Sequence, residues 1–183
     1  MGASIRKGMM MTFKFVLLGA AAALAAASPA IAADGPTDPQ IANIAYTAGA
    51  IDIAAGKQAL AKSHNATVRA FAQEMVRDHK AVNDKALALV KKLHVTPEAN
   101  PTSASLTKAA DATRDRLSHL SGAAFDRAYI DNEVAYHKTV NGALESTLIP
   151  SAKNPELKSL LETGLTLFRE HQAHAEQIAK AVK

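Results

Sequence analysis

The chain has 183 residues, with 21 Lys and Arg against 17 Asp and Glu, and it contains neither cysteine nor tryptophan. Without cysteine, a disulfide framework and a thiolate metal site are both excluded. No cluster of Lys and Arg is interleaved with aromatic residues, so the sequence gives no indication of nucleic-acid binding.

Residues 1–33 have the features of an export signal. A basic start precedes an apolar run from Phe15 to Ala27, and Ala30-Ile31-Ala32 has the small-x-small pattern of a cleavage site. The run is shorter than the ~20 residues that a membrane-spanning helix needs. We therefore predict a cleaved signal peptide over residues 1–33 and a periplasmic mature protein without a transmembrane anchor. The sequence does not decide among the alternative starts at Met1, Met9, Met10 and Met11.

Cleavage would change the charge balance of the working protein. Arg6, Lys7 and Lys14 would be lost, and 18 basic residues would then face 17 acidic ones. The remaining residues, 34–183, suit a single domain with a sizeable core.

The mature sequence predicts a nearly all-α fold, because apolar residues recur at helical spacing and no strand-like alternation persists. Asp38-Pro39 is typical of a helix start, and it predicts a first helix to about Ser63. Within it, Gly49 and Gly56 indicate close approach of another backbone. Asn65 can cap a second helix that extends to about Leu93.

Prolines predict where the helices of the second half begin and end. Pro97 and Pro101 indicate a loop over 95–102, followed by a shorter helix from Ser103 or Ser105 to Ser121-Gly122. A third long helix over 123–148 should stop before Pro150, and Asn154-Pro155 should start the last one. This order predicts a ferritin-like four-helix bundle with a short extra helix in the long crossover between the second and third long helices.

The seven histidines fall into two groups. His64, His94 and His119 lie at predicted helix ends, where an imidazole satisfies terminal carbonyls. The other four lie inside helices: His79, His137, His171 and His174.

One metal-ligand side chain lies near the middle of each long helix. At a rise of about 1.5 Å per residue, their depths differ by only about 5 Å, so an antiparallel bundle would bring them to one level. These four candidate metal ligands are Asp52, His79, His137 and His171.

The sequence leaves two interpretations of this group of side chains open. Burying such groups is costly unless they share a partner, and a divalent ion such as Zn, Fe, Mn or Cu(II) would suit nitrogen and oxygen ligands. A metal-free polar network that fixes the register of the bundle would also satisfy them.

Further residues could support the site. Glu133 lies one turn before His137, and His174 lies one turn after His171, so both are candidate additional ligands. Glu74, Asp78 and Glu170 are candidate partners that orient the imidazoles.

Several stretches of the chain resemble an exported, ferritin-like family labelled as a domain of unknown function, family 4142. The stretches are Gly49-x-x-Asp52-x-x-x-Gly56, the nine residues Phe71 to His79, the nine residues Ser121 to Tyr129, and Arg169-Glu170-His171. The resemblance extends from about Asp38 to Ala179 and implies the fold and export, including periplasmic or outer-membrane location, but no established activity. Members usually carry glutamate where this chain has Asp52.

The chain lacks the Glu-x-x-His signature of di-iron ferritins. The residue three positions before His79 is Val76, and the residue three positions before His171 is Phe168, where the signature has glutamate. Iron storage and di-iron oxidation are therefore disfavoured. The leading hypothesis is a non-enzymatic metal-binding protein in metal or envelope-stress handling. The alternatives are a metal-dependent oxidoreductase acting on oxygen or peroxide, and a metal-free structural or interaction protein. The sequence does not indicate the oligomeric state or a protein partner.

Overall fold

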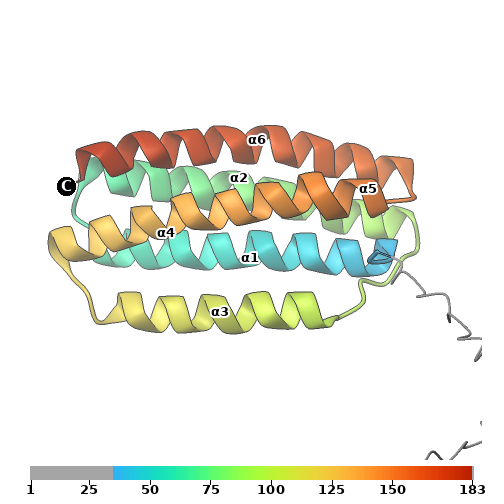
Figure 1. Ribbon diagram of the computed structural model, residues 1–183, viewed down its shortest axis with the longest axis horizontal. Helices are drawn as coiled ribbons and strands as arrows, with labels where there is room; N and C mark the ends of the chain where they lie inside the picture. The colour runs from blue at the N-terminus through green and yellow to red at the C-terminus, as the bar shows by residue number, and fades with distance from the viewer. Residues whose placement is uncertain (1–34, 183) are drawn as a thin grey trace, which may run out of the picture. The chain divides into compact units, whose positions relative to one another are not determined.

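The computed structural model describes residues 35–182, so the predicted signal peptide over 1–33 lies outside the described residues. Between residues 35 and 182 the chain forms helices and connecting loops, without a strand. The four long helices are α1 (Asp38–Lys62), α2 (Ala66–Lys92), α4 (Gly122–Ala143) and α6 (Pro155–Ala181) (Figure 1). The all-α prediction is confirmed. No described helix combines the length and apolar character that a membrane span requires.

A shorter helix, α3 (Pro101–Ser118), forms the long crossover between α2 and α4. It runs beside α1 for most of the length of the bundle and returns the chain from the end of α2 to the start of α4 (Figure 1). The short connection between α1 and α2 makes these two helices antiparallel, and α4 is likewise antiparallel to α6. This is the predicted ferritin-like topology.

Asparagine side chains define three of the helix starts. Asn65 Oδ1 accepts hydrogen bonds from Thr67 and Val68, and Asn154 caps α6 in the same way. Asn100 caps α3 and forms a capping box with Ser103, so α3 begins at Pro101 rather than at Ser103 or Ser105. Proline at the first helical position needs no hydrogen-bond partner for its nitrogen, which explains the earlier start.

The prediction that the third long helix stops before Pro150 is wrong. After α4 the chain continues through a π-helical turn, η1 (Leu144–Leu148), and a short α5 (Ile149–Ser151). The Ile149 N–H donates to the Leu144 carbonyl, five residues earlier. Proline normally crowds the carbonyl four residues before it, and a widened turn at this point accommodates its ring.

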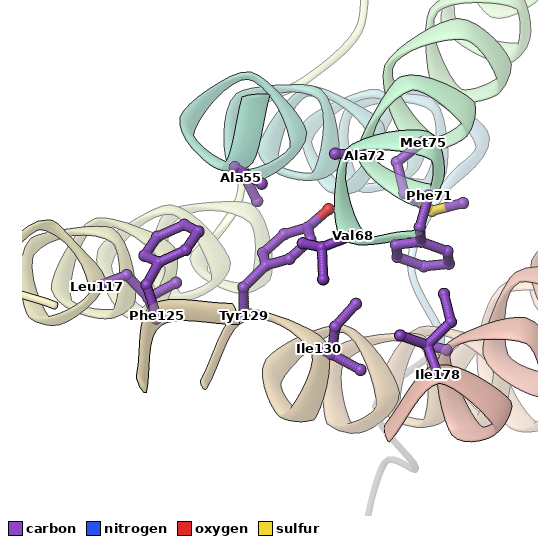
Figure 2. Packing of buried hydrophobic residues seen from close by; sticks show 12 residues of the cluster. Ala55, Val68, Phe71, Ala72, Met75, Leu117, Phe125, Tyr129, Ile130 and Ile178 are labelled. Carbon is purple, nitrogen blue, oxygen red and sulfur yellow. The ribbon is translucent and has the colours of Figure 1, made fainter. Parts of the chain in front are cut away.

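Two apolar clusters fill the bundle, one toward each end. In the first, Phe71 contacts Tyr129 edge-on and Phe125 stacks on Tyr129 (Figure 2). The second cluster is formed by aliphatic residues together with one aromatic ring: Ile41, Ile44, Leu144, Leu148, Ala152, Leu157, Leu161, Leu165 and Phe168. Along every long helix, the candidate ligands lie between the residues of these two clusters, which places them in an apolar surrounding.

Gly56 lies where α1 and α2 approach each other closely. A Cβ atom at this position would lie 2.9 Å from Val76 Cγ2 and 3.0 Å from the Ala72 carbonyl oxygen. Contacts that short require the neighbours to move, so the close approach predicted for this glycine is confirmed.

The C-terminus of α2 has a Schellman motif with histidine in the position that favours glycine. His94 has φ 54°, its N–H donates to the Lys91 carbonyl, and the Val95 N–H donates to the Val90 carbonyl. We expect His94→Gly to raise the free energy of unfolding by roughly 1 kcal/mol, because glycine adopts this backbone without a Cβ clash. Urea unfolding measures the change. His94→Ala is the control, and an equal gain in that variant would show that backbone strain is not the cause.

Candidate metal centre

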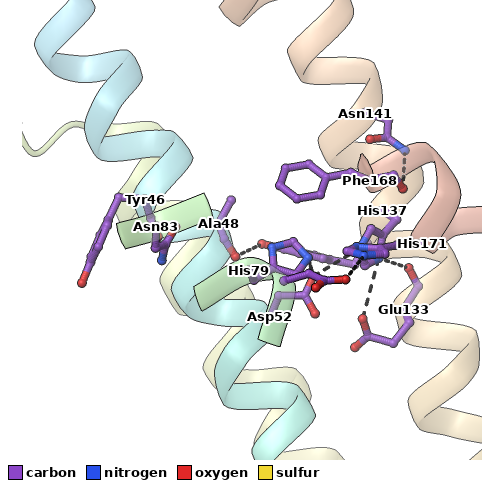
Figure 3. A network of polar contacts seen from close by, with 12 residues as sticks. Tyr46, Ala48, Asp52, His79, Asn83, Glu133, His137, Asn141, Phe168 and His171 are labelled. Carbon is purple, nitrogen blue, oxygen red and sulfur yellow. Dashed lines mark hydrogen bonds and ion pairs between the residues drawn. The ribbon is translucent and has the colours of Figure 1, made fainter. Parts of the chain in front are cut away.

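Each long helix contributes one buried polar side chain to a single cluster at mid-bundle. Asp52 Oδ2 lies 3.0 Å from His79 Nε2 and 3.4 Å from His137 Nε2 (Figure 3). His171 completes the set, with its ring centroid 5.3 Å from that of His79 and 5.5 Å from that of His137. The fold therefore brings together all four residues that the sequence suggested as ligands.

Neighbouring groups fix the orientation of these imidazoles. The His137 Nδ1–H donates to the Glu133 carbonyl oxygen at 3.0 Å, because a carbonyl can only accept. His171 Nε2–H donates to Asp78 Oδ2 at 3.2 Å for the same reason. The His79 ring stacks on Phe168 with a centroid distance of 4.6 Å and an interplanar angle of 13°. Each of the two hydrogen-bonded rings thus keeps one nitrogen with a free lone pair.

The atoms that face one another in this cluster lack hydrogen-bond partners. They are both oxygens of Asp52, both nitrogens of His79, His137 Nε2 and His171 Nδ1. The 3.0 Å contact between Asp52 and His79 is short, but its angles do not suit a hydrogen bond. Unpaired polar atoms in an apolar interior are costly, so this collection favours a shared partner.

The spacing around Asp52 Oδ2 is close to that of ligands that share one metal ion. Ligands about 2.1 Å from a tetrahedral ion lie about 3.4 Å from one another. The distances of 3.0 and 3.4 Å from Asp52 Oδ2 to the two imidazole nitrogens are close to that value. Candidate ligand atoms of His79, His137 and His171 also lie within 4.8 Å of one another. These buried His and Asp side chains could hold a metal ion.

Glu133 forms a second group with Asp52 and His137. Its carboxylate Oε2 lies 3.7 Å from His137 Nδ1, and one ligand atom from each of the three residues lies within 4.8 Å of the other two. Glu133 is completely enclosed, with 1% of its surface exposed. The structure therefore places this candidate additional ligand next to the four-residue cluster.

Comparison with known families identifies the chain. Residues 20–178 match the family described as Domain of unknown function, DUF4142. The chain belongs to this family. The solved structures include a similar DUF305 protein from Streptomyces coelicolor, whose name presents it as secreted. It is 10% identical, with a TM-score of 0.57 over 78% of this chain and 87% of that one, so the likeness concerns the fold. No significant match was found among curated proteins.

Burial and mutual proximity change the ionisation of the acidic groups in this DUF4142 chain. Burial alone would raise the pKa of Asp52, but His79 and then His137 outweigh it and lower the pKa to about 2. Burial, followed by the charge of Asp52, raises the pKa of Glu133 well above its usual range. The cluster therefore contains one anionic carboxylate, Asp52, and one protonated carboxyl group, Glu133.

Burial has the opposite effect on the two imidazoles whose pKa values change. It lowers the pKa of His137, and together with the proximity of His79 it lowers the pKa of His171 to about 4. Both rings are neutral at pH 7, which is the form that binds a metal.

The remaining candidates lie outside the cluster. Asp78 contacts His171 directly, as expected of a residue that orients the imidazole. Glu74 Oε2 instead lies 2.8 Å from Nδ1 of His174, which is half-buried. Glu170 is exposed, and its side chain makes no hydrogen bond or ion pair within residues 35–182, so the structure does not bring it to the site.

Sequence reasoning missed two buried asparagines near the cluster. Asn83 donates to the Tyr46 carbonyl, and Asn141 donates to the Phe168 carbonyl and to Gln172. Both lie one turn beyond a histidine, His79 or His137, on the same helix face. That spacing is the signal that could have identified them.

Proposed function

We propose that this DUF4142 protein is an exported ferritin-like bundle that binds one divalent transition-metal ion through Asp52, His79, His137 and His171. The observation that supports the proposal is the set of inward-facing, unpartnered ligand atoms, one or more from each long helix. The neutral imidazoles of His137 and His171 and the anionic Asp52 are in the ionisation states that metal binding requires.

The ligand types narrow the choice of ion. Three imidazoles and a carboxylate, without sulfur, suit Zn, Fe, Mn or Cu(II). Four protein ligands would fill the coordination of a tetrahedral ion, whereas catalytic sites keep one position open for water or substrate. All four side chains are also almost inaccessible to solvent. Both features favour a binding role in metal or envelope-stress handling over oxygen or peroxide turnover.

The direct test is a titration of chelator-stripped protein without a histidine tag. We expect Zn²⁺ to bind at one ion per chain and to raise the midpoint of thermal unfolding, because the ion binds the folded state selectively. Mass spectrometry under native conditions gives the stoichiometry. Protein that takes up no Zn²⁺, Fe²⁺, Mn²⁺ or Cu²⁺ would leave a metal-free polar network as the role of the cluster.

Export is the second part of the proposal. It is supported by the basic and apolar start of the sequence and by the secreted description of the DUF305 relative. We expect the protein to begin at Ala33 or Asp34 in the soluble periplasmic fraction of a bacterial host. Intact mass measurement of that fraction checks the cleavage point. A protein that retains Phe15 to Ala27 in the membrane fraction would contradict it.

A further inference from the structure

A second group of metal-ligand side chains connects the buried cluster to solvent between α2 and α6. On α2, Glu74 and Asp78 lie one turn apart; on α6, His171 and His174 do the same. The antiparallel helices pair them into two steps, with His174 against Glu74 at 2.8 Å and His171 against Asp78 at 3.2 Å. Ligand atoms of Glu74, Asp78 and His171 lie within 4.8 Å of one another.

The exposure of these four side chains falls steadily toward the cluster. The exposed fraction is 41% for His174, 29% for Glu74, 17% for Asp78 and 1% for His171. The other two groups of metal-ligand residues within residues 35–182 are fully buried. Apolar clusters close the bundle on either side of the site. Polar side chains between α2 and α6 therefore connect the solvent to the buried ligands.

Asp78 forms an ion pair with Arg77, whose side chain is exposed and can move away. Arg77 donates to both of its carboxylate oxygens, at 2.7 and 2.9 Å, and the Arg77 side chain is 69% exposed. An exposed guanidinium can move into solvent at little cost, since surface ion pairs contribute little stability. A divalent cation could then replace the positive charge of Arg77 beside Asp78.

We propose that Glu74, Asp78, His174 and the Nε2 atom of His171 form an outer divalent-cation site through which the central site is loaded. This inference rests on the proposed function of the central cluster. A neutral imidazole has one lone pair, so His171 serves one ion at a time. With the ion outside, Nε2 is the ligand; with the ion inside, Nδ1 is the ligand and Nε2–H donates to Asp78, as it does in this structure. The outer site is thus available only while the central site is empty.

Kinetics distinguish a loading site from a residue that supports the bound ion. Glu74 and His174 do not belong to the central set, so changing them should leave the final bound state unaltered. An ion that leaves must pass the same outer site, so association and dissociation should slow by the same factor and Kd should stay constant. A residue that merely stabilises the loaded protein would change dissociation and Kd together.

The experiment uses Co²⁺, whose visible absorption bands report its binding, in stopped-flow mixing with metal-free mature protein. Dissociation is followed after mixing the loaded protein with excess chelator. We expect Glu74→Gln and His174→Gln each to slow both rates by about tenfold, as loss of a charged or polar steering group does, with Kd within about twofold of the unmodified protein. Far-UV circular dichroism confirms that each variant is folded.

Glu162→Gln is the matched control, because it removes the same charge from an exposed position on α6. Its rates should equal those of the unmodified protein. Unchanged rates in Glu74→Gln and His174→Gln, or a changed Kd with unchanged association, would overturn the outer site and leave the central site intact. If the unmodified protein binds no Co²⁺ at all, the proposed function fails and the outer site fails with it.

Discussion

His79→Ala and His171→Ala are each expected to weaken Zn²⁺ binding by at least about 100-fold, beyond the 10- to 100-fold that loss of an orienting partner costs. His79 Nε2 lies 3.0 Å from Asp52 Oδ2, its ring centroid lies 5.3 Å from that of His171, and both of its nitrogens lack hydrogen-bond partners. His171 is the contribution of α6 to the same set. Isothermal titration at pH 7.5 with tag-free protein measures the affinities.

Controls separate ligand loss from general damage. His119→Ala removes an exposed imidazole with 76% of its side chain accessible, and it should leave the affinity unchanged. Asp78→Asn keeps a hydrogen-bond acceptor for His171 and should cost less than removing His171 itself. If His79→Ala and His171→Ala remain folded and bind Zn²⁺ with the affinity of the unmodified protein, the ion does not occupy the central cluster.

The helices and the level of the cluster could be predicted because they depend on local spacing. Asn65 and Asn154 cap their helices through contacts within three residues, and apolar periodicity determines which face is buried. Equal depth along four helices of similar length then brings Asp52, His79 and His171 to one height. Neither inference requires knowledge of distant contacts.

Features that depend on the path of one helix against another could not be predicted. The choice of Nε2 or Nδ1 in His171 follows from the position of Asp78 on a different helix. The stacking of Phe168 on His79 likewise depends on how α6 packs against α2. The π turn before Pro150 was also not predicted, because sequence rules describe a regular α-helix, in which proline is a terminator, whereas a widened turn accommodates its ring.

The metal-free protein is expected to be most stable near pH 6.5 and to lose stability on either side. In the folded state the pKa of His171 is lowered to about 4 and that of His137 is also lowered, through burial. In the unfolded chain both imidazoles return to about 6.5. Below pH 6.5 the unfolded chain therefore binds protons that the folded protein does not, and stability falls as the pH falls.

Glu133 has the opposite effect on the pH dependence of stability. Burial and the charge of Asp52 keep its carboxyl group protonated in the folded state, while the unfolded chain loses this proton above about pH 4.5. Between about pH 4.5 and 6.5 His171 offsets this single carboxyl group and His137 adds to its effect, so the free energy of unfolding should rise with pH. Above pH 6.5 the imidazoles are neutral in both states, and of these three groups only Glu133 binds a proton in the folded protein that it loses in the unfolded chain. Stability should therefore fall with increasing pH.

Two variants test which residue causes the loss of stability below pH 6.5 and which causes the loss above it. Glu133→Gln keeps the shape of a neutral carboxyl group but has no titrating proton. It should therefore remove the decline above pH 6.5 and make the rise between about pH 4.5 and 6.5 steeper. His171→Gln should reduce the acidic side, where His171 alone accounts for up to about 3 kcal/mol, because its pKa shift extends from 6.5 to about 4. Urea unfolding in the presence of chelator, repeated across this pH range, measures both. A Glu133→Gln variant that still loses stability above pH 6.5 would show that Glu133 is not the cause of the decline, which would contradict a raised pKa for Glu133 in the folded protein.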